Sequence, residues 1–375
     1  MSNEDFFEKQ SDLTASKILI YREYLSNYLP KVLMQYGHCY ITDFFCGCGK
    51  NGQKDGSPLV LIDEARKILG NSILKKKWPN AQIEILFSDF NEKYCENLLL
   101  HLNKMNIPTN IKIYGPNCES FNTIIEKKID VFKNNNTIPR FFFLDPFTYS
   151  DVKIDDVKML MDLPSSEVLL FLPIFHSYRF AEYENKPETL KNFLNNFTEK
   201  GDSACYKDIY DFSESIRKKL LKYIDLKYVR SVCLDGGTRK NALFYLTKHI
   251  RGMLIMNDLV WKYTHDGRMV KAKIDNNLVL FDLPKISENF QKIKDCFIEY
   301  IKEKKQLTNV EIIDFIAQIG FSTKYAREIL KEMKEHGNIC IEYKKENKKK
   351  GFYISNDNWN EELTKIIYMG DKNGK

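Results

Sequence analysis

Short apolar runs alternate with amphipathic segments along the first two thirds of the chain. The runs predict strands at 38–45, 83–89, 111–115, 140–145 and 167–173. The segments between them repeat apolar residues at helical spacing and predict helices. Strands that are apolar throughout and separated by helices are typical of a parallel sheet covered on both faces.

Cap residues and periodicity place the helices of this first part. The first 40 residues predict one long helix, with Ile18, Tyr21 and Tyr24 on its apolar face. Ser57 as N-cap and Gly70 after the end predict a helix over 58–69. Further helices are expected at 91–105 (opened by Asn91), near 119–133 and around 153–162.

A charged, mostly helical insertion is expected at 177–226, and two more strands follow at 228–234 and 241–247. The turn sequence DGGTRK joins these two strands, so they pair antiparallel, because a parallel crossover needs a longer connection. The helix that follows, 248–263, is expected to cap the sheet. Parallel strands that end in an antiparallel hairpin resemble S-adenosylmethionine-dependent methyltransferases. We therefore expect an α/β fold with a Rossmann-type, class I methyltransferase-like sheet.

The C-terminal part predicts a second, smaller domain. Pro284 and Ser287 mark a boundary, after which three helices lead into a hairpin, NICIEYKKENKKKGFYIS, with a lysine-rich tip. Three helices and such a hairpin indicate a C-terminal winged-helix domain. The expected domains are 1–280 and 286–358, with a tail at 359–375 that forms a short helix.

Composition narrows the function classes. The 375 residues are 43% hydrophobic, which excludes wholesale disorder, and no apolar run reaches the ~18 residues of a membrane span. The start, MSNEDFFEKQ, differs from a signal peptide, and the nine cysteines form no CxxC pair. We expect a cytoplasmic protein with reduced thiols and no metal site. A net charge of +6 permits a nucleic-acid partner without requiring one.

The strongest local motif is the loop Asp43-Phe-Phe45-Cys-Gly47-Cys-Gly49 after the first strand. Glycines there let backbone amides approach a ligand, although a tight turn without a ligand is the alternative. With Gly52 the loop also matches GxGxxG, which suggests a nicotinamide or flavin cofactor. In that fingerprint, however, the helix opens within the motif and an acid lies ~20 residues on. Here the helix waits until Ser57, and the next strand-end acid is 40 positions beyond Gly49.

That acid, Asp89, ends the second strand, where a carboxylate accepts hydrogen bonds from both ribose hydroxyls; a helix cap is the alternative. Asn117 and Cys118 follow the third strand and are candidates for reading an adenine. The predicted cofactor is S-adenosylmethionine. The residues expected to bind it are Asp43, Phe45, Gly47, Gly49, Ser57, Asp89, Asn117 and Cys118.

Asp145-Pro146-Phe147 follows the fourth strand, where substrate meets cofactor in an open parallel sheet. The motif resembles the Asp-Pro-Pro-aromatic sequence of amino methyltransferases, in which a carboxylate holds an exocyclic amine and a ring stacks on the base. The alternative is that Asp145 caps the next helix and Phe147 packs inward. His176 follows the fifth strand and is a further catalytic candidate.

Lysines concentrate in the predicted winged helix. The wing tip carries Lys344, Lys345, Lys348, Lys349 and Lys350, and the helix before it carries Lys324 and Arg327. Basic wings beside a recognition helix contact phosphates, so these residues are the predicted nucleic-acid interface. A solvated surface or a protein–protein module is the alternative.

Four segments together, DFFCGCG, DGSPLVLIDEA, FSDFN and FLDPFTYS, resemble the three-Cys-motif partner protein family over about 15–260. The family's motifs fall on Asp43, Gly47 and Gly49, on Gly56, Ser57 and Pro58, and on Asp145, Pro146 and Phe147. Cys46, Cys48 and Thr148 depart from them. The resemblance implies a methyltransferase-like protein of bacteria and mobile elements, encoded beside a radical-SAM-like three-cysteine partner.

The sequence thus predicts an S-adenosylmethionine-dependent methyltransferase that acts on nucleic acid, at a DNA or RNA base. The rival is a non-catalytic protein that uses the same fold to dock nucleic acid or its neighbour protein. A third reading is a nuclease-associated or phage-defence effector.

Overall fold

The computed structural model describes residues 12–133, 137–203, 205–236, 240–264, 266–271, 287–344 and 351–371. The chain divides into two compact units. The sheet unit comprises residues 1–248 with 270–273, and the C-terminal unit comprises 249–269 with 274–375. In the described residues no helix combines the length and apolar character needed to cross a membrane.

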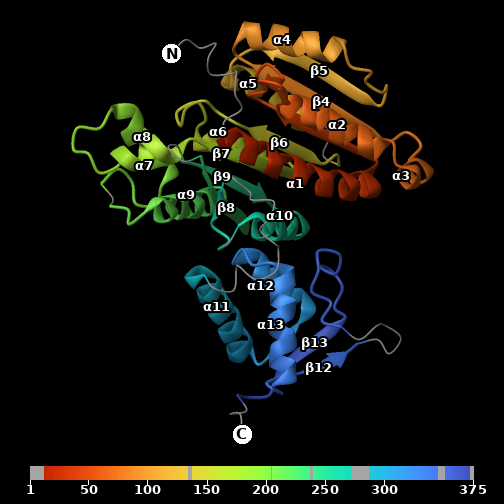
Figure 1. Ribbon diagram of the computed structural model, residues 1–375, viewed down its shortest axis with the longest axis vertical. Helices are drawn as coiled ribbons and strands as arrows, with labels where there is room; N and C mark the ends of the chain where they lie inside the picture. The colour runs from red at the N-terminus through yellow and green to blue at the C-terminus, as the bar shows by residue number, and fades with distance from the viewer. Residues whose placement is uncertain are drawn as a thin grey trace. The chain divides into compact units, whose positions relative to one another are not determined.

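The sheet unit is built on an eight-stranded mixed sheet in the order β10-β8-β9-β7-β6-β1-β4-β5 (Figure 1). Its strands are β1 (His38–Asp43), β4 (Gln82–Asp89), β5 (Ile111–Cys118), β6 (Arg140–Leu144), β7 (Ser166–Leu172), β8 (Tyr228–Asp235), β9 (Lys240–Thr247) and β10 (Met269–Lys271). The five strands from β5 to β7 pair in parallel, and β9 pairs antiparallel with both β7 and β8. This confirms the predicted parallel strands and terminal antiparallel pair; part of the DGGTRK turn, 237–239, lies outside the described residues.

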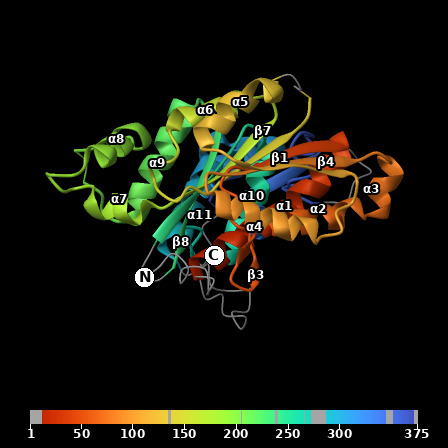
Figure 2. The same cartoon turned by 90° about the horizontal axis from the view of Figure 1, so that it is seen from above.

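Helices cover both faces of this sheet. The helices of this unit are α1 (Asp12–Tyr36), α2 (Ser57–Leu69), α3 (Ser72–Lys77), α4 (Glu92–Asn103), α5 (Phe121–Lys133), α6 (Ile154–Asp162), α7 (Ile174–Phe180), α8 (Glu188–Phe197) and α9 (Ile209–Tyr223), of which α8 packs on α9 and not on the sheet. Figure 2 shows α5 and α6 on the opposite side of the sheet from α1 and α2. The last three helices form the insertion that was predicted at 177–226. The sequence pattern did not predict the short α3.

A small hairpin interrupts the glycine loop, and the sequence analysis missed it. It consists of β2 (Lys50–Asn51) and β3 (Lys54–Asp55), paired antiparallel. The amide of Gly56 donates a 2.8 Å hydrogen bond to the carbonyl oxygen of Gly49, so the hairpin is closed at its base. A Cβ at Gly56 would lie 3.0 Å from that oxygen, which explains the glycine. The hairpin accounts for the long gap between the glycine loop and α2.

The start of α2 corrects a prediction. Gly56, rather than Ser57, is the N-cap, and Ser57 is the first helical residue. The Ser57 hydroxyl therefore does not cap the helix. It donates a 2.7 Å hydrogen bond to Oδ2 of Asp43 instead.

A polar cluster lies inside the otherwise apolar core of the sheet unit. Tyr24 of α1 donates a 2.6 Å hydrogen bond to Oε2 of Glu167 on β7 and bonds the hydroxyl of Tyr245 on β9. Thr247 donates to the other Glu167 oxygen at 3.2 Å. Burial raises the pKa of Glu167, so this cluster ties α1 to the middle of the sheet through a carboxyl group whose charge is disfavoured.

The C-terminal unit contains α10 (Ile250–Tyr263), α11 (Glu288–Lys304), α12 (Asn309–Gln318) and α13 (Thr323–Glu335). A three-stranded antiparallel sheet joins β11 (Gln306–Thr308), β13 (Thr364–Tyr368) and β12 (Ile339–Tyr343), in that order.

The structure moves the domain boundary from the predicted 280 to 248, because α10 belongs to the C-terminal unit. Trp261 donates a 2.8 Å hydrogen bond to the carbonyl oxygen of Gly320, and Asp258 accepts hydrogen bonds from Ser322 and Thr323. These contacts attach α10 to the start of α13. Of the boundary predicted at 276–287, residues 276–286 lie outside the described residues, and Ser287 is the N-cap of α11.

The second strand of the predicted hairpin was also misplaced. The partner of β12 is β13, rather than 351–355, so part of the tail that was predicted as a helix is a strand. Asn309, which is buried on α12, holds the start of β13 in place, because its Oδ1 accepts hydrogen bonds from the amides of Leu363 and Thr364. Its Nδ2 donates to the carbonyls of Asn358 and Glu361.

Candidate functional site at the carboxyl edge of the sheet

Three carboxylates lie at or just beyond the carboxyl ends of adjacent parallel strands. Asp43 ends β1, Asp89 ends β4, and Asp145 follows β6. From β1 the chain proceeds to β4 on one side and returns to β6 on the other, so the strand order reverses here. Ligands of open α/β sheets bind at such a reversal. The topology therefore brings the predicted motifs together.

The glycine loop spans this reversal. Gly47 has φ +63°, and its amide donates a 2.9 Å hydrogen bond to Oδ2 of Asp89. A Cβ built on Gly47 meets no atom within 4 Å, so free space lies in front of this backbone. Gly49, at φ +85°, is different: a Cβ there would lie 2.9 Å from Cδ1 of Leu98. Gly47 thus faces a space that a ligand can enter, while Gly49 packs against α4.

Asp43 is fully buried beneath this loop. It accepts hydrogen bonds from the Ser57 hydroxyl (2.7 Å) and the Phe45 amide (3.3 Å). Burial raises the pKa of Asp43 to about 7, and the negative charge of Asp145 raises it as well, against the lowering effect of the Ser57 hydrogen bond. The ring of Phe45 packs against Phe121, with 5.4 Å between centroids.

Asp89 links the glycine loop to the start of α4. Its Oδ2 accepts the Gly47 amide, and its Oδ1 accepts the Asn91 amide at 2.9 Å. The helix cap itself is Asn91, as predicted for that residue. Burial raises the pKa of Asp89. An ionised carboxylate has about four acceptor positions, so Asp89 keeps acceptor capacity for a ligand hydroxyl beside its backbone amides.

Asn117 and Cys118 were predicted to follow the third strand, and they are the last two residues of β5, beside Ser88 and Asp89 of β4. Cys118 is the register partner of Asp89 in the parallel β4–β5 pair, and its side chain is exposed. Asn117 donates a 3.2 Å hydrogen bond to the carbonyl oxygen of Phe87. The amide of Asn117 therefore supports the strand end, and Cys118 is the more accessible of the two.

Asp145 has a partner that the sequence analysis missed. Lys17, on α1, forms an ion pair with Oδ2 of Asp145, and the two side chains are 15% and 22% exposed. The Lys17 ammonium also lies 5.7 Å from the centroid of the Phe171 ring. The sequence contained a hint of this pair. Lys17 lies on the same helix face as the buried Tyr21 and Tyr24, and a lysine on a buried face is usually paired with a carboxylate.

The alternative reading of this motif is wrong. Asp145 does not cap α6, whose N-cap is Lys153. Phe147, after Pro146, does not pack inward, since 49% of it is exposed. Its ring contacts Phe90 edge-on at 5.9 Å and Tyr94 at 6.4 Å. Because Phe90 follows Asp89 and is 63% exposed, an aromatic surface joins the two acidic motifs.

His176 is not part of this arrangement in the described residues. It is an exposed residue of α7, and its ring stacks on Phe180 at 6.4 Å and contacts Phe175. The described ranges also contain no cluster of three His, Cys, Asp or Glu side chains able to hold a metal ion.

Acidic and basic side chains lie next to one another on α13, where Lys331 forms an ion pair with Glu335 at 3.8 Å. Glu328, Glu332 and Glu335 line a cavity of about 310 Å³ with residues of α11, and Lys331 also lines it. Lys324 and Arg327 are exposed, with Lys331 and Lys334 continuing their stripe at helical spacing. Lys344 pairs with Glu362. The other predicted wing-tip residues, Lys345, Lys348, Lys349 and Lys350, lie outside the described residues.

Comparison with known proteins gives matches in structure alone. No protein-family model matches the sequence, and no curated protein matches it. One similar solved structure is the O-methyltransferase TomG from Streptomyces achromogenes in complex with SAM. Its identity is 9% and its TM-score 0.34, with 66% of this chain and 94% of that chain covered.

Two further structures match at a similar level. The plantazolicin methyltransferase BpumL, with a pentazolic analogue and SAH, is 11% identical at a TM-score of 0.30, over 63% of this chain and 86% of that one. An O-methyltransferase from Bacillus cereus, in complex with SAH, is 10% identical at a TM-score of 0.32, and the match covers 64% of this chain and 92% of that one. At these values the roles of individual residues rest on the geometry of this chain.

Proposed function

We propose that this protein is an S-adenosylmethionine-dependent methyltransferase. The observation that carries the proposal is the sheet itself: five parallel strands, an antiparallel β9–β8 end, and a glycine loop at the point where the strand order reverses. A nicotinamide cofactor fits less well. In the dinucleotide fingerprint the helix opens within the glycine motif, whereas here a closed hairpin separates the two.

The residues present fit this cofactor. The open space at Gly47 accommodates a ligand against the loop backbone, and Asp89 retains acceptor capacity for a ribose hydroxyl. Bound S-adenosylmethionine supplies a methyl group activated by its sulfonium. A cationic ligand near Asp43 favours the ionised form of that carboxyl, whose pKa burial raises to about 7. Binding is then accompanied by proton release from Asp43 near neutral pH.

Asp145, Pro146 and Phe147 are proposed to position the acceptor. Methyl transfer is an in-line displacement, so orientation contributes much of the rate. Phe147 and Phe90 offer exposed ring faces and edges on which a planar acceptor packs. Lys17 holds the Asp145 carboxylate in place and balances its charge.

We propose nucleic acid as the acceptor, with the C-terminal unit as a winged helix that docks it. The order α11-β11-α12-α13-β12-β13 and the sheet order β11-β13-β12 support the winged helix. The exposed Lys324, Arg327 and Lys334 support phosphate contact from α13, whereas Lys331 is paired with Glu335. The three-cysteine neighbour protein is proposed on the sequence resemblance alone.

Calorimetry with S-adenosylmethionine tests the cofactor, with NAD as the comparison ligand. We expect binding to the wild type and its loss in Gly47→Val, because valine strains a left-handed backbone and fills the open space. Gly370→Val is the matched control, since Gly370 also has positive φ and open surroundings. Binding of NAD alone, or equal loss in both variants, contradicts the proposal.

Transfer of labelled methyl groups to DNA, RNA and tRNA tests the acceptor. Asp145→Ala should abolish transfer while cofactor binding by calorimetry is retained. Cofactor binding without transfer to any nucleic acid, in wild type and variant alike, favours the docking protein over the enzyme.

A further inference from the structure

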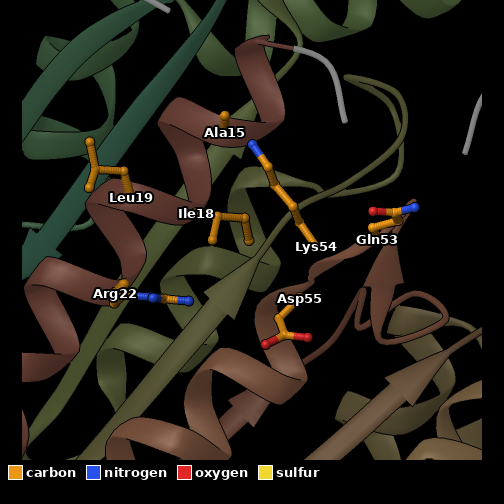
Figure 3. Close-up of a pocket in the computed structure, with 7 residues that line it drawn as sticks. All are labelled: Ala15, Ile18, Leu19, Arg22, Gln53, Lys54 and Asp55. Carbon is orange, nitrogen blue, oxygen red and sulfur yellow. The ribbon is translucent and has the colours of Figure 1, made fainter. Parts of the chain in front are cut away.

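A cavity of about 420 Å³ lies between α1 and the β2–β3 hairpin, within the sheet unit. Its lining comes from Ala15, Ile18, Leu19 and Arg22 on one side and from Gln53, Lys54 and Asp55 on the other (Figure 3). The volume is within the range of small-molecule sites, ~300–1,000 Å³. None of these seven residues belongs to the cofactor or acceptor motifs described above.

Two cations enter this cavity from opposite walls. Figure 3 shows Arg22 pointing from α1 toward the hairpin, and Lys54 pointing from the hairpin toward Ala15. Within the described part of the chain neither cation has a carboxylate partner or a hydrogen bond. Unpaired Arg and Lys side chains that converge from two elements are suited to an anionic oxygen group such as phosphate.

The rest of the lining restricts the ligand further. Ile18 and Leu19 provide an apolar wall, on which a flat or apolar body can pack. Asp55 and Gln53 add a carboxylate and an amide on the hairpin side. A carboxylate repels an anion but accepts hydrogen bonds from hydroxyl or amino groups. A fatty acid can pair with the two cations and pack on the apolar wall, but it offers no hydrogen-bond donor to Asp55. A nucleoside phosphate can do all of this: its phosphate pairs with the cations, its base packs on the apolar wall, and its hydroxyl or amino groups donate hydrogen bonds to Asp55.

We propose that this cavity binds a nucleoside phosphate, supplied either as a free nucleotide or as one unit of the acceptor strand. The inference rests on the proposed function and deepens it, because it gives the sheet unit its own contact with nucleic acid. Lys17 lies between Ala15 and Ile18 on α1 and pairs with Asp145, so one helix serves both sites. The hairpin likewise begins and ends at the glycine loop.

Binding to the full chain tests this, with S-adenosylhomocysteine at saturation so that the nucleotide does not report on the cofactor site. Uridine monophosphate, a labelled oligouridine, inorganic phosphate and octanoate are titrated in turn. We expect the oligouridine to bind, with or without the mononucleotide, and the double variant Arg22→Gln with Lys54→Gln to weaken that binding at least tenfold. If only the oligouridine binds tightly, the nucleoside phosphate is a unit of the acceptor strand. If uridine monophosphate binds with the same dissociation constant as one site on the oligouridine, the ligand is a free nucleotide.

The matched control is Lys75→Gln with Lys76→Gln on α3, which removes the same charge from exposed positions of the same unit. Leu19→Glu places a negative charge in the cavity and should also weaken nucleotide binding. Equal weakening in the two double variants, stronger binding of octanoate, or no nucleotide binding overturns the inference. Calorimetry with S-adenosylmethionine on the same samples tests the proposed function separately, because Arg22 and Lys54 lie outside the proposed cofactor residues and their substitution reports on the cavity alone.

Discussion

The buried carboxyl of Asp43 predicts a specific pH dependence of stability. An unfolded aspartate has a pKa of ~3.9, whereas burial raises the pKa of Asp43 to about 7. Between these values the folded chain keeps a proton that the unfolded chain has lost. The stability present at low pH is therefore lost as the pH rises toward 7, by about 1.4 kcal/mol per pH unit. From pH 5 to pH 7 this amounts to about 2 kcal/mol, because the folded carboxyl is itself half ionised at pH 7.

Asp43→Asn removes this dependence, because the amide does not ionise, although its single oxygen can accept from only one of the two donors, the Ser57 hydroxyl or the Phe45 amide. Any cost of placing the amide nitrogen is the same at both pH values. We expect the free energy of unfolding of the variant, relative to wild type, to rise by about 3 kcal/mol between pH 5 and pH 8. Urea unfolding followed by circular dichroism measures the difference, with the exposed Asp162→Asn as control.

A constant difference between the two proteins across this pH range refutes the reasoning, since it would mean that Asp43 ionises in the folded state as easily as in the unfolded chain. A difference that falls as the pH rises refutes it as well.

The remaining predictions concern α1. Lys17→Met leaves the Asp145 carboxylate without its cation and should lower the free energy of unfolding by about 1–3 kcal/mol; adding Asp145→Asn should recover most of the loss in a double-mutant cycle. Tyr24→Phe breaks the hydrogen bond to buried Glu167 and should cost about 1–3 kcal/mol in urea unfolding. Tyr28→Phe is its control and should change stability by less than about 0.5 kcal/mol, because the buried Tyr28 hydroxyl has no hydrogen-bond partner among the residues that the structure describes. Equal effects of the two substitutions would contradict this assignment.

Much of the sheet unit could be predicted, because its signals are local. The apolar runs predicted the strands, and Asn91 and Gly70 are the helix caps that the sequence predicted. Given a parallel sheet, Asp43, Asp89 and Asp145 were then expected at one edge, where the structure has them. The rule that parallel strands share a carboxyl edge needs no side-chain detail.

What was missed depends on contacts between distant residues. Lys17 meets Asp145 across 128 positions of sequence, and no local pattern pairs them. The strand Thr364–Tyr368 is held by Asn309, which lies far back in the chain. The periodicity of α10 is compatible with packing on the sheet or on other helices. Only its hydrogen bonds to Gly320, Ser322 and Thr323 show that it belongs to the C-terminal unit.

The closed base of the β2–β3 hairpin has an evolutionary consequence. Gly49 and Gly56 already meet through a hydrogen bond, so the six residues between them leave and re-enter the loop at nearly one point. An ancestral chain without them would need little rearrangement to run from the glycine loop into α2. The hairpin is thus a natural position for insertions of variable length, and related chains could change what they recognise there while the backbone around Gly47 stays the same.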